Sequence, residues 1–315
     1  MTKPTVLLTR RIPLSVLATL EAACEVDQHD SNDFPHQELL ARVRGKQGVI
    51  CVLTDAITPD VLDAGRELKI VANIAVGYNN IDVQAARERA VVVTNTPDVL
   101  TEATADLTWA LIMDITRRIS EGDRLVRRGG WNGWTLDFML GTELRGKQLG
   151  IIGYGRIGRA VAARAIVFGM RVVYFDLALG ADPIGMPLDR LLASSDIVSI
   201  HCPLTPETRH LINQASLARM KRSAYLVNTS RGPVVDEGAL AWALGNGIIS
   251  GAALDVYEEE PQVHPDLLSL ENVVLAPHLG SATTETRTAM ADLAVRNTIA
   301  VLTGQSPITP VPGLA

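Results

Sequence analysis

The amino-acid sequence predicts an α/β protein with parallel sheets. Short apolar runs alternate with longer stretches of helical periodicity along almost the whole chain, and this alternation is typical of parallel strands joined by crossover helices. The alternation occurs in two series, one on each side of a segment rich in glycine and tryptophan at 128–134. Because 315 residues are enough for about two domains, we expect two α/β domains with a ligand cleft between them.

The first series predicts a sheet with helices between its strands. Strands are expected at Val6–Thr9, Gly48–Leu53, Leu68–Ile74 and Val91–Thr94, and helices at about 13–24, 36–44, 58–65 and 82–89. A longer helix follows, with Thr101 as its N-cap and with acidic residues in or near its first turn.

The second series begins near Arg145 and suffices for a complete doubly wound sheet. A last helical pattern runs from Glu285 to Leu302. The strands of this series are expected at Leu149–Ile152, Arg171–Asp176, Asp196–His201, Ala224–Asn228, Gly251–Val256 and Asn272–Ala276.

Composition excludes several classes of function. With 29 Lys+Arg against 35 Asp+Glu, the chain is not a polybasic binder of nucleic acid or of a membrane surface. No apolar run approaches the ~20 residues of a membrane span. The three cysteines are far apart and the histidines are isolated, so we expect no disulfide framework and no metal site. Without a signal peptide, a reducing cytoplasm fits best.

A glycine-rich loop, Gly153-Tyr-Gly155-Arg-Ile-Gly158, follows one apolar run and opens a helical pattern. In a dinucleotide-binding loop the first glycine permits a tight turn, the second lets backbone N–H groups approach a pyrophosphate, and the third lets helix and strand pack closely. The alternative is a tight turn without a ligand. Because strand, loop, helix and a second strand fall in register, the pattern favours a dinucleotide cofactor.

The strand after the loop ends in Asp176, which points to the choice of cofactor. A carboxylate at this position can accept hydrogen bonds from the adenosine ribose diol, and it would repel the 2′-phosphate of NADP. Leu177 follows and offers no compensating guanidinium. We therefore expect NAD(H) to be the preferred cofactor, with NADP(H) disfavoured by Asp176.

Three later segments, at 227–233, 254–261 and 275–281, carry polar residues where strands should end. Ligand-binding groups of open α/β sheets lie at such ends. Arg231, a carboxylate of Glu258–Glu260 and His278 could form a carbonyl-reducing set: arginine grips a substrate carboxylate, and a carboxylate-supported histidinium donates the proton. Taken singly, each has a structural alternative, as a surface ion pair, a solvated acidic loop or a hydrogen-bonded core histidine.

Together these segments resemble the signatures of the D-2-hydroxyacid dehydrogenase family. The matching motifs are N-x-x-R-G-x-x-V-D from Asn228, L-D-V-x-x-x-E-P from Leu254 and P-H-x-G-S-A-T from Pro277. The resemblance runs over essentially the whole chain. Within the family the chain looks most like glyoxylate/hydroxypyruvate reductases, with supporting stretches at 8–13, 75–82, 95–101 and 130–134.

The resemblance implies two flavodoxin-like or Rossmann-like domains, with the nucleotide domain inserted into a discontinuous substrate domain. The expected boundaries are 1–98 for the first part of the substrate-binding domain, 99–282 for the NAD-binding Rossmann domain with a dimerisation arm, and 283–315 for the C-terminal helix that returns to the substrate domain. Family members are usually dimers, so a homodimer is expected. Trp134 matches an arm tryptophan that enters the partner's active site, although ordinary dimer packing explains it equally well.

The resemblance also implies residue roles. His278 matches the family acid/base, Glu260 its carboxylate partner and Arg231 the substrate-orienting arginine. Substrate contacts are expected at Leu53, Val76, Gly77, Arg231, His278 and Ser281, and at Trp134 of the partner subunit. Cofactor contacts are expected at Thr101, Gly153, Gly155, Arg156, Ile157, Gly158, Asp176, Cys202, Pro203, Thr229, Asp255, His278 and Gly280.

These features predict NADH-dependent reduction of glyoxylate to glycolate or of hydroxypyruvate to D-glycerate, with His278 as proton donor. Many reductases of this subgroup favour NADP. Because this chain has Asp176, either it is an NAD-preferring reductase or it belongs to a different subgroup. The alternatives are another D-2-hydroxyacid dehydrogenase, of the D-lactate, phosphoglycerate or phosphite type, or a dinucleotide-sensing, corepressor-like binding protein that keeps the same three residues. We expect no appended regulatory domain, because few residues follow the last helical pattern.

Overall fold

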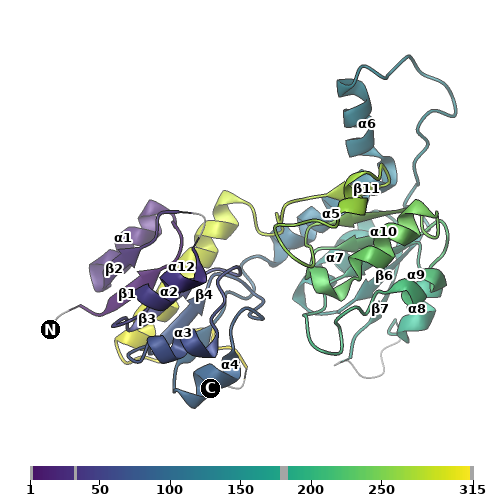
Figure 1. Cartoon of the computed structure of the whole chain (residues 1–315). Helices are drawn as coiled ribbons and strands as arrows, with labels where there is room; N and C mark the ends of the chain where they lie inside the picture. Colours follow the sequence, from purple (N-terminus) through teal and green to yellow (C-terminus); the bar gives the residue numbers. More distant parts are fainter. Residues whose placement is uncertain (1–2, 32–33, 178–183, 313–315) are drawn as a thin grey trace. The chain divides into compact units, whose positions relative to one another are not determined.

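The structure is a computed structural model that describes residues 3–31, 34–177 and 184–312. The chain divides into two compact units (Figure 1). Unit 1 combines the chain up to Leu100 with the chain from Thr283 onward, and unit 2 is the continuous stretch Thr101–Ala282. Both units are built on parallel sheets, which confirms the predicted fold class.

Unit 1 contains a five-stranded parallel sheet of order β2-β1-β3-β4-β5 among the described residues. This is the flavodoxin-like order. Along β1, Leu7 faces one hydrophobic cluster while Val6 and Leu8 face the other, so this strand is apolar on both sides. The strands are β1 (Thr5–Leu8), β2 (Glu25–Gln28), β3 (Gly48–Cys51), β4 (Ile70–Asn73) and β5 (Val92–Thr94).

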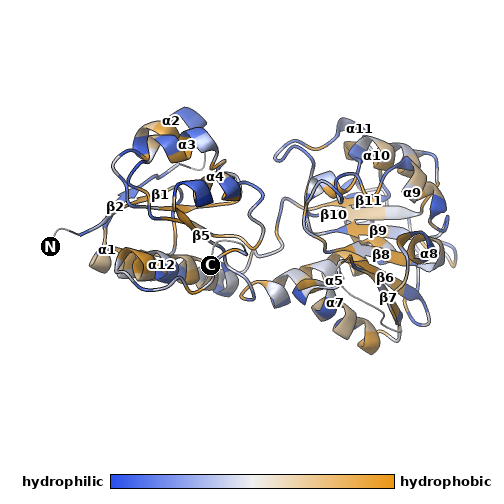
Figure 2. Ribbon diagram, turned by 90° about the horizontal axis from the view of Figure 1, so that it is seen from below, coloured by the Kyte–Doolittle hydropathy of each residue, from blue (hydrophilic) through white to orange (hydrophobic). Residues whose placement is uncertain are grey.

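Helices cover both faces of this sheet, as Figure 2 shows. The last helix of the chain packs with the first against one face, where Ala291, Ala294 and Val295 join the cluster formed by β1, β3 and β4. One face carries α1 (Leu14–Ala23) and α12 (Thr284–Leu302), and the other carries α2 (His36–Arg42), α3 (Pro59–Ala64) and α4 (Val83–Glu88).

The segment after α12 returns to the edge of the unit 1 sheet. Thr94 and Pro310 form an antiparallel bridge, and the backbone N–H of Val311 donates to the carbonyl of Val93 at 3.0 Å. Asn297, fully buried on α12, holds this segment: its Oδ1 accepts the N–H groups of Ile308 and Thr309 at 2.9 and 3.0 Å. One buried amide therefore joins the last helix to the sheet edge.

Unit 2 contains a six-stranded parallel sheet of order β11-β10-β9-β8-β6-β7 among the described residues. Beyond β7, Tyr174 and Gly185 add a single parallel bridge. The direction of strand addition reverses between β6 and β8, which makes the sheet doubly wound and places a switch point there. The strands are β6 (Gln148–Ile152), β7 (Arg171–Phe175), β8 (Ile197–Ile200), β9 (Tyr225–Asn228), β10 (Gly251–Leu254) and β11 (Val273–Leu275).

The two faces of the unit 2 sheet have separate hydrophobic clusters. Trp109 and Ile112 of one helix pack with Leu149 and Ile151 of β6, while Ile152 faces the opposite cluster. The first face carries α5 (Thr101–Arg117) and α7 (Arg156–Val167), and the second carries α8 (Leu188–Ser194), α9 (Gln214–Arg219) and α10 (Glu237–Gly245). Two further short elements of unit 2 are the 3-10 turn η1 (Gly232–Val234) and α11 (Pro265–Leu268).

Helix α6 (Ile119–Arg127) and the segment that leads on to β6 project from unit 2 (Figure 1). No residue of α6 is buried, and apolar side chains remain exposed along this arm, including Val126 at 57% and Trp134 at 76%. An exposed apolar surface of this kind is typical of a protein–protein interface.

The structure differs from the sequence-based expectations in three places. Strand β2 was not predicted, because it is an edge strand with only Val26 as an apolar residue and no buried side chain. Helix α5 begins at Thr101 itself, so this threonine is the first helical residue rather than the N-cap. The long helix also ends at Arg117, since Arg118 adopts a left-handed conformation with φ of 57° before α6 begins.

Within the described residues, none of the helices combines the length and the apolar character that crossing a membrane requires.

The buried amide of Asn297 leads to a prediction about stability. We expect Asn297→Ala to lower the free energy of unfolding by about 1–3 kcal/mol, because two partly buried N–H groups lose their acceptor. Chemical denaturation measures the change. The neighbouring Arg296→Ala removes only an exposed i,i+4 pair with Asp292 and should cost less than ~0.5 kcal/mol. Equal effects of the two variants would contradict this role.

Candidate active site

The predicted site residues of unit 2 follow the carboxyl ends of its parallel strands. The glycine loop follows β6, Asp176 follows β7, and Cys202 and Pro203 follow β8. Thr229 and Arg231 follow β9, Asp255 and Glu260 follow β10, and His278, Gly280 and Ser281 follow β11. Because parallel strands end at the same edge, the fold gathers these residues along one side of the sheet.

The glycine loop has the geometry of a phosphate-binding turn. Gly153 has φ of +92°, and a Cβ there would lie 2.4 Å from the backbone nitrogen of Cys202. A Cβ on Gly158 would lie 2.2 Å from the carbonyl oxygen of Gly153, so the start of α7 packs directly on the turn. Gly155 faces open space, with no atom within 4 Å of its Cβ position.

The start of α7 is suited to an anion. Gly155 is its N-cap, and among the described residues no side chain caps the helix. The first N–H groups of a helix need an external partner, and phosphate is a suitable one. The open approach over Gly155 and these N–H groups fit the pyrophosphate of a dinucleotide. Arg156 and Ile157 form the first turn of this helix.

Asp176 is tied to the glycine loop. Its Oδ2 accepts the backbone N–H of Tyr154 at 2.7 Å. The ring of Tyr154 stacks on Tyr174 of β7, with centroids 4.1 Å apart. Cys202 lies beside the loop in the next strand end, where burial raises the pKa of its thiol to about 11. Asp176 and the glycine loop are therefore joined by a hydrogen bond.

His278 and Glu260 form a close pair. Nδ1 of His278 lies 2.7 Å from Oε2 of Glu260, and both side chains are about one quarter exposed. Although burial alone would raise the pKa of Glu260, the hydrogen bond and charge of His278, the N–H of Tyr257 and the charge of Arg231 together lower it. Glu260 is thus held as a carboxylate, and it leaves Nε2 of the histidine for a substrate.

Arg231 is brought near this pair by a backbone contact. Gly232 packs against the carbonyl group of Tyr257, and a Cβ on Gly232 would lie only 1.8 Å from the carbonyl carbon. Tyr257 in turn donates its N–H to Oε1 of Glu260 at 3.1 Å. Burial lowers the pKa of Arg231, and the charge of Glu260 opposes this shift. The glycine after the arginine therefore sets how closely the two charged segments approach.

The backbone around His278 is held by Asp255. Its two carboxylate oxygens accept the N–H groups of Leu279 at 2.6 Å and Gly280 at 2.8 Å. His278 itself has a left-handed φ of 54°, which a residue with a side chain adopts only when its surroundings require it. Desolvation raises the pKa of Asp255, partly opposed by the two N–H groups and by His278. Asp255 thus anchors the turn that presents the histidine.

Helix α5 supports the same strand ends from one face of the sheet. The hydroxyl of Thr104 donates to the carbonyl of Gly280 at 3.1 Å, and the Thr108 and Thr229 hydroxyls lie 3.0 Å apart. Thr101, the expected cofactor contact, begins this helix.

In unit 1, the expected substrate contacts also follow strand ends: Leu53 follows β3, and Val76 and Gly77 follow β4. Side-chain amides hold these loops. Nδ2 of Asn73 donates to the carbonyl of Gly77 at 2.9 Å, and Nδ2 of Asn95 donates to the carbonyl of Val76 at 2.8 Å. These two hydrogen bonds occupy the carbonyls of Val76 and Gly77 and hold the backbone of the loop in place. The backbone N–H groups are then the polar groups that a ligand could contact.

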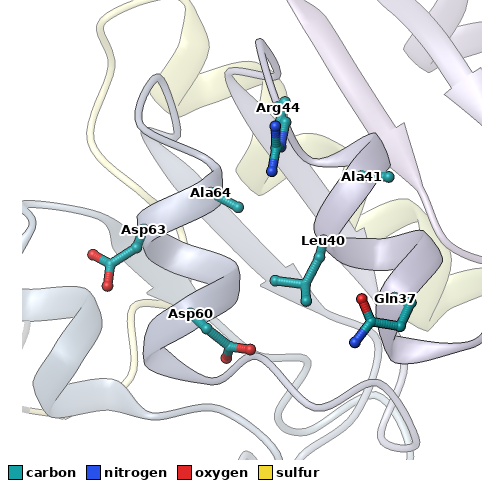
Figure 3. A pocket seen from close by; sticks show the side chains of 7 residues that line it. All are labelled: Gln37, Leu40, Ala41, Arg44, Asp60, Asp63 and Ala64. Atoms are coloured by element: carbon teal, nitrogen blue, oxygen red, sulfur yellow. The ribbon is translucent and has the colours of Figure 1, made fainter.

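Two other surface features lie apart from these residues. Trp134 lies on the exposed arm of unit 2 with 76% of its surface exposed, and among the described residues it forms no hydrogen bond or ring contact with the strand-end residues. A surface hollow of about 680 Å³ lies between α2 and α3 of unit 1 (Figure 3). No expected site residue lines this hollow, which is bordered by Gln37, Leu40, Ala41, Arg44, Asp60, Asp63 and Ala64. Among the described residues no group of acidic, histidine and cysteine side chains could hold a metal ion.

The residues that support the His278–Glu260 pair were not predicted from the sequence. Glu237 and Glu258 exchange hydrogen bonds with each other's backbone, and Tyr257 bridges the ends of β10 and β11 through its hydroxyl, 2.9 Å from the carbonyl of Ala276. The available signals were the glutamate after Asp236 and the acidic triplet of 258–260. Neither signal shows that the two segments meet.

The arrangement can bind an anionic carbonyl compound and protonate its oxygen. Arg231 supplies a positive charge, and the His278–Glu260 pair supplies a positioned proton donor. The neighbouring glycine loop fits a dinucleotide, which would bring redox chemistry to the same strand ends.

Comparison with known proteins places these features in one family. Residues 109–280 match the family model for the D-isomer specific 2-hydroxyacid dehydrogenase, NAD binding domain. The chain is 48% identical over 319 residues to a glyoxylate reductase of Thermofilum pendens, covering 98% of this chain and 94% of that protein. It is 49% identical over 315 residues to a glyoxylate reductase of Korarchaeum cryptofilum, covering 97% and 95%.

Solved structures show the same likeness. A protein of Thermus thermophilus is similar with a TM-score of 0.93 and 47% identity, covering 98% of this chain and 99% of that one. An NADPH-dependent glyoxylate/hydroxypyruvate reductase of Sinorhizobium meliloti, in complex with NADP and malonate, is similar with a TM-score of 0.89 and 36% identity, covering 99% and 97%.

The contact at Gly232 leads to a prediction. We expect Gly232→Ala to lower the free energy of unfolding by about 1–3 kcal/mol, because the new methyl group overlaps the backbone of Tyr257. Thermal or chemical denaturation measures the change. Gly245→Ala is the matched control, since its Cβ meets no atom within 4 Å, and it should be neutral or slightly stabilising. A Gly232→Ala protein as stable as the control would show that the contact does not constrain the site.

Proposed function

The chain belongs to the D-isomer specific 2-hydroxyacid dehydrogenase family, and from this membership and the geometry of its site we propose that it reduces glyoxylate to glycolate and hydroxypyruvate to D-glycerate with NADH. The observation that carries the proposal is the pair of His278 Nδ1 and Glu260 Oε2 at 2.7 Å, beside the segment of Arg231. Three curated relatives that cover nearly the whole chain are named glyoxylate reductases, which supports the choice of substrate.

The residues of this chain would share the work as follows. The reduced nicotinamide, when bound, supplies a hydride to the carbonyl carbon of the substrate. Arg231 binds the substrate carboxylate and polarises the carbonyl. His278 donates a proton from Nε2 to the carbonyl oxygen, while Glu260 accepts the hydrogen bond from Nδ1 and fixes the orientation of the ring.

The N–H groups of Val76 and Gly77 would complete the recognition of the substrate carboxylate, with Leu53 and Ser281 as further substrate contacts. The fixed carbonyls of the 76–77 loop support this assignment, because they hold the N–H groups in place. Other D-2-hydroxyacid dehydrogenase substrates, of the D-lactate, phosphoglycerate or phosphite type, are the second candidates. A dinucleotide-sensing binding protein, which would keep the same three residues, is less favoured, since the relatives that cover nearly the whole chain are named as reductases.

We propose NAD(H) rather than NADP(H) as the preferred cofactor. The Sinorhizobium meliloti relative is named as NADPH-dependent, so membership of the family does not decide the choice. The carboxylate of Asp176 supports NAD(H), because it lies 2.7 Å from the N–H of Tyr154 in the phosphate loop, where a 2′-phosphate would meet its charge.

We further propose a homodimer joined through the α6 arm, with Trp134 as a contact to the partner. The exposed apolar side chains of the arm support this. The three buried, free cysteines support a reducing compartment, and we propose the cytoplasm.

The decisive experiment follows absorbance at 340 nm with NADH and glyoxylate, hydroxypyruvate, pyruvate or phosphohydroxypyruvate. We expect fast turnover with glyoxylate and hydroxypyruvate.

His278→Gln should lower kcat by about 10²–10⁴-fold, the contribution of a general acid, with NADH affinity unchanged. Turnover of phosphohydroxypyruvate or pyruvate alone would replace the substrate assignment. If His278→Gln lost NADH affinity together with kcat, the histidine would have a structural role.

Asp176→Asn separates charge from hydrogen bonding in cofactor choice, because the amide oxygen can still accept the N–H of Tyr154. We expect the ratio of kcat/KM for NADH over NADPH to fall by about tenfold or more, since one charge–charge interaction near a protein surface is worth about 1–4 kcal/mol. Asp189→Asn, at an exposed position of α8, is the control and should keep the ratio. An unchanged ratio in Asp176→Asn would show that this carboxylate does not read the ribose.

A further inference from the structure

Two glutamates outside the catalytic set exchange hydrogen bonds in unit 2. Oε1 of Glu237 accepts the backbone N–H of Glu258 at 2.5 Å, and Oε1 of Glu258 accepts the backbone N–H of Glu237 at 2.9 Å. The second oxygen of each is also used: Oε2 of Glu237 accepts the N–H of His264 at 3.1 Å, and Oε2 of Glu258 lies 2.9 Å from Nε2 of His210. All four carboxylate oxygens therefore have partners.

The two carboxylates lie in a favourable electrostatic environment. Glu237 is the first residue of α10, so the Glu258 carboxylate binds an N–H group at the positive end of that helix. Glu237 is only 5% exposed, and a buried carboxylate is stable only when its oxygens are satisfied. Loss of either carboxylate would leave a backbone N–H group without its acceptor.

These bonds bracket the segment that carries Glu260. Glu237 binds the backbone two residues before Glu260, at Glu258, and four residues after it, at His264. Between these anchors, Glu260 bonds the N–H of Tyr257 and reaches Nδ1 of His278. The position of the Glu260 carboxylate therefore depends on a side chain from a different element, α10.

We propose that Glu237, together with Glu258, is a positioning residue for the proton donor, acting through the backbone of 258–264 on Glu260 and hence on His278. This inference rests on the proposed reductase function for its kinetic consequences. Neither glutamate touches the reacting atoms in this arrangement. A displacement of about 1 Å at a catalytic group can lower the rate about 10²-fold, so the effect is measurable.

The kinetic test compares Glu237→Gln with the native protein. The glutamine keeps the shape and one acceptor but turns an N–H donor toward a backbone N–H. We expect kcat with glyoxylate to fall about 10–100-fold, while the Kd for NADH, measured by fluorescence, stays within about twofold. The exposed neighbour Glu259→Gln is the matched control and should keep kcat. Glu258→Gln, which can keep its bond to Glu237, should give an intermediate loss and serves if Glu237→Gln does not fold.

A second readout does not depend on turnover. The proton on Nδ1 of His278, hydrogen-bonded to a carboxylate, gives a downfield resonance in the NMR spectrum, identified by its loss in His278→Gln. We expect this resonance to persist in Glu259→Gln and to move or vanish in Glu237→Gln. A native resonance and native kcat in a Glu237→Gln or Glu258→Gln protein with only a lower Tm would overturn the proposal, because the pair would then support the fold alone.

The two readouts separate this inference from the proposed function. If the native protein reduces none of the keto acids, the reductase proposal fails, and the His278 resonance still decides whether Glu237 positions Glu260. If the native protein is active and Glu237→Gln matches it in kcat and in the resonance, only the positioning role fails.

Discussion

The spacing of the active site depends on a contact that involves no functional side chain. The backbone of Gly232 lies against the carbonyl of Tyr257, closer than any other residue would permit. Because Arg231 precedes this glycine and Glu260 bonds the N–H of Tyr257, the contact fixes the distance between the ends of β9 and β10. Glu260 then holds His278 on the next strand. The charged side chains of Arg231 and Glu260 are thus held near each other by a contact between the uncharged backbones of Gly232 and Tyr257.

The periodicity of the chain was sufficient to predict the two parallel sheets, since buried parallel strands are apolar on both faces and stand out as short runs. Strand β2 was not predicted, because an edge strand pairs on one side only and needs few apolar residues. The end of α5 at Arg117 was not predicted, because the left-handed conformation of the next residue, Arg118, leaves no mark in composition. Local patterns predict elements well where burial is symmetrical and poorly where the chain meets solvent.

The candidate site shows the same division. The glycine loop, Arg231, Glu260 and His278 stand in short motifs, so the sequence could propose them as a set. Glu237 and Glu258 were not proposed as supports, although both belong to or adjoin those motifs, because their partners are backbone groups in a distant segment. Asp255 was expected as a cofactor contact, and the structure adds a role that the motif did not indicate: its oxygens accept the N–H groups beside His278. A spacing rule finds chemistry that side chains perform and overlooks side chains that hold the backbone in place.

The return of α12 to unit 1 has a consequence for how the protein is made. Ala291, Ala294 and Val295 fill the core between β1, β3 and β4, so the first hundred residues leave the ribosome without part of their own interior. Unit 2 is continuous and can fold while synthesis proceeds. Unit 1 has to wait for the last helix, and in the meantime the part of one sheet face that α12 covers stays open, beside α1. During that interval the nascent chain presents an apolar sheet surface of the kind that molecular chaperones bind.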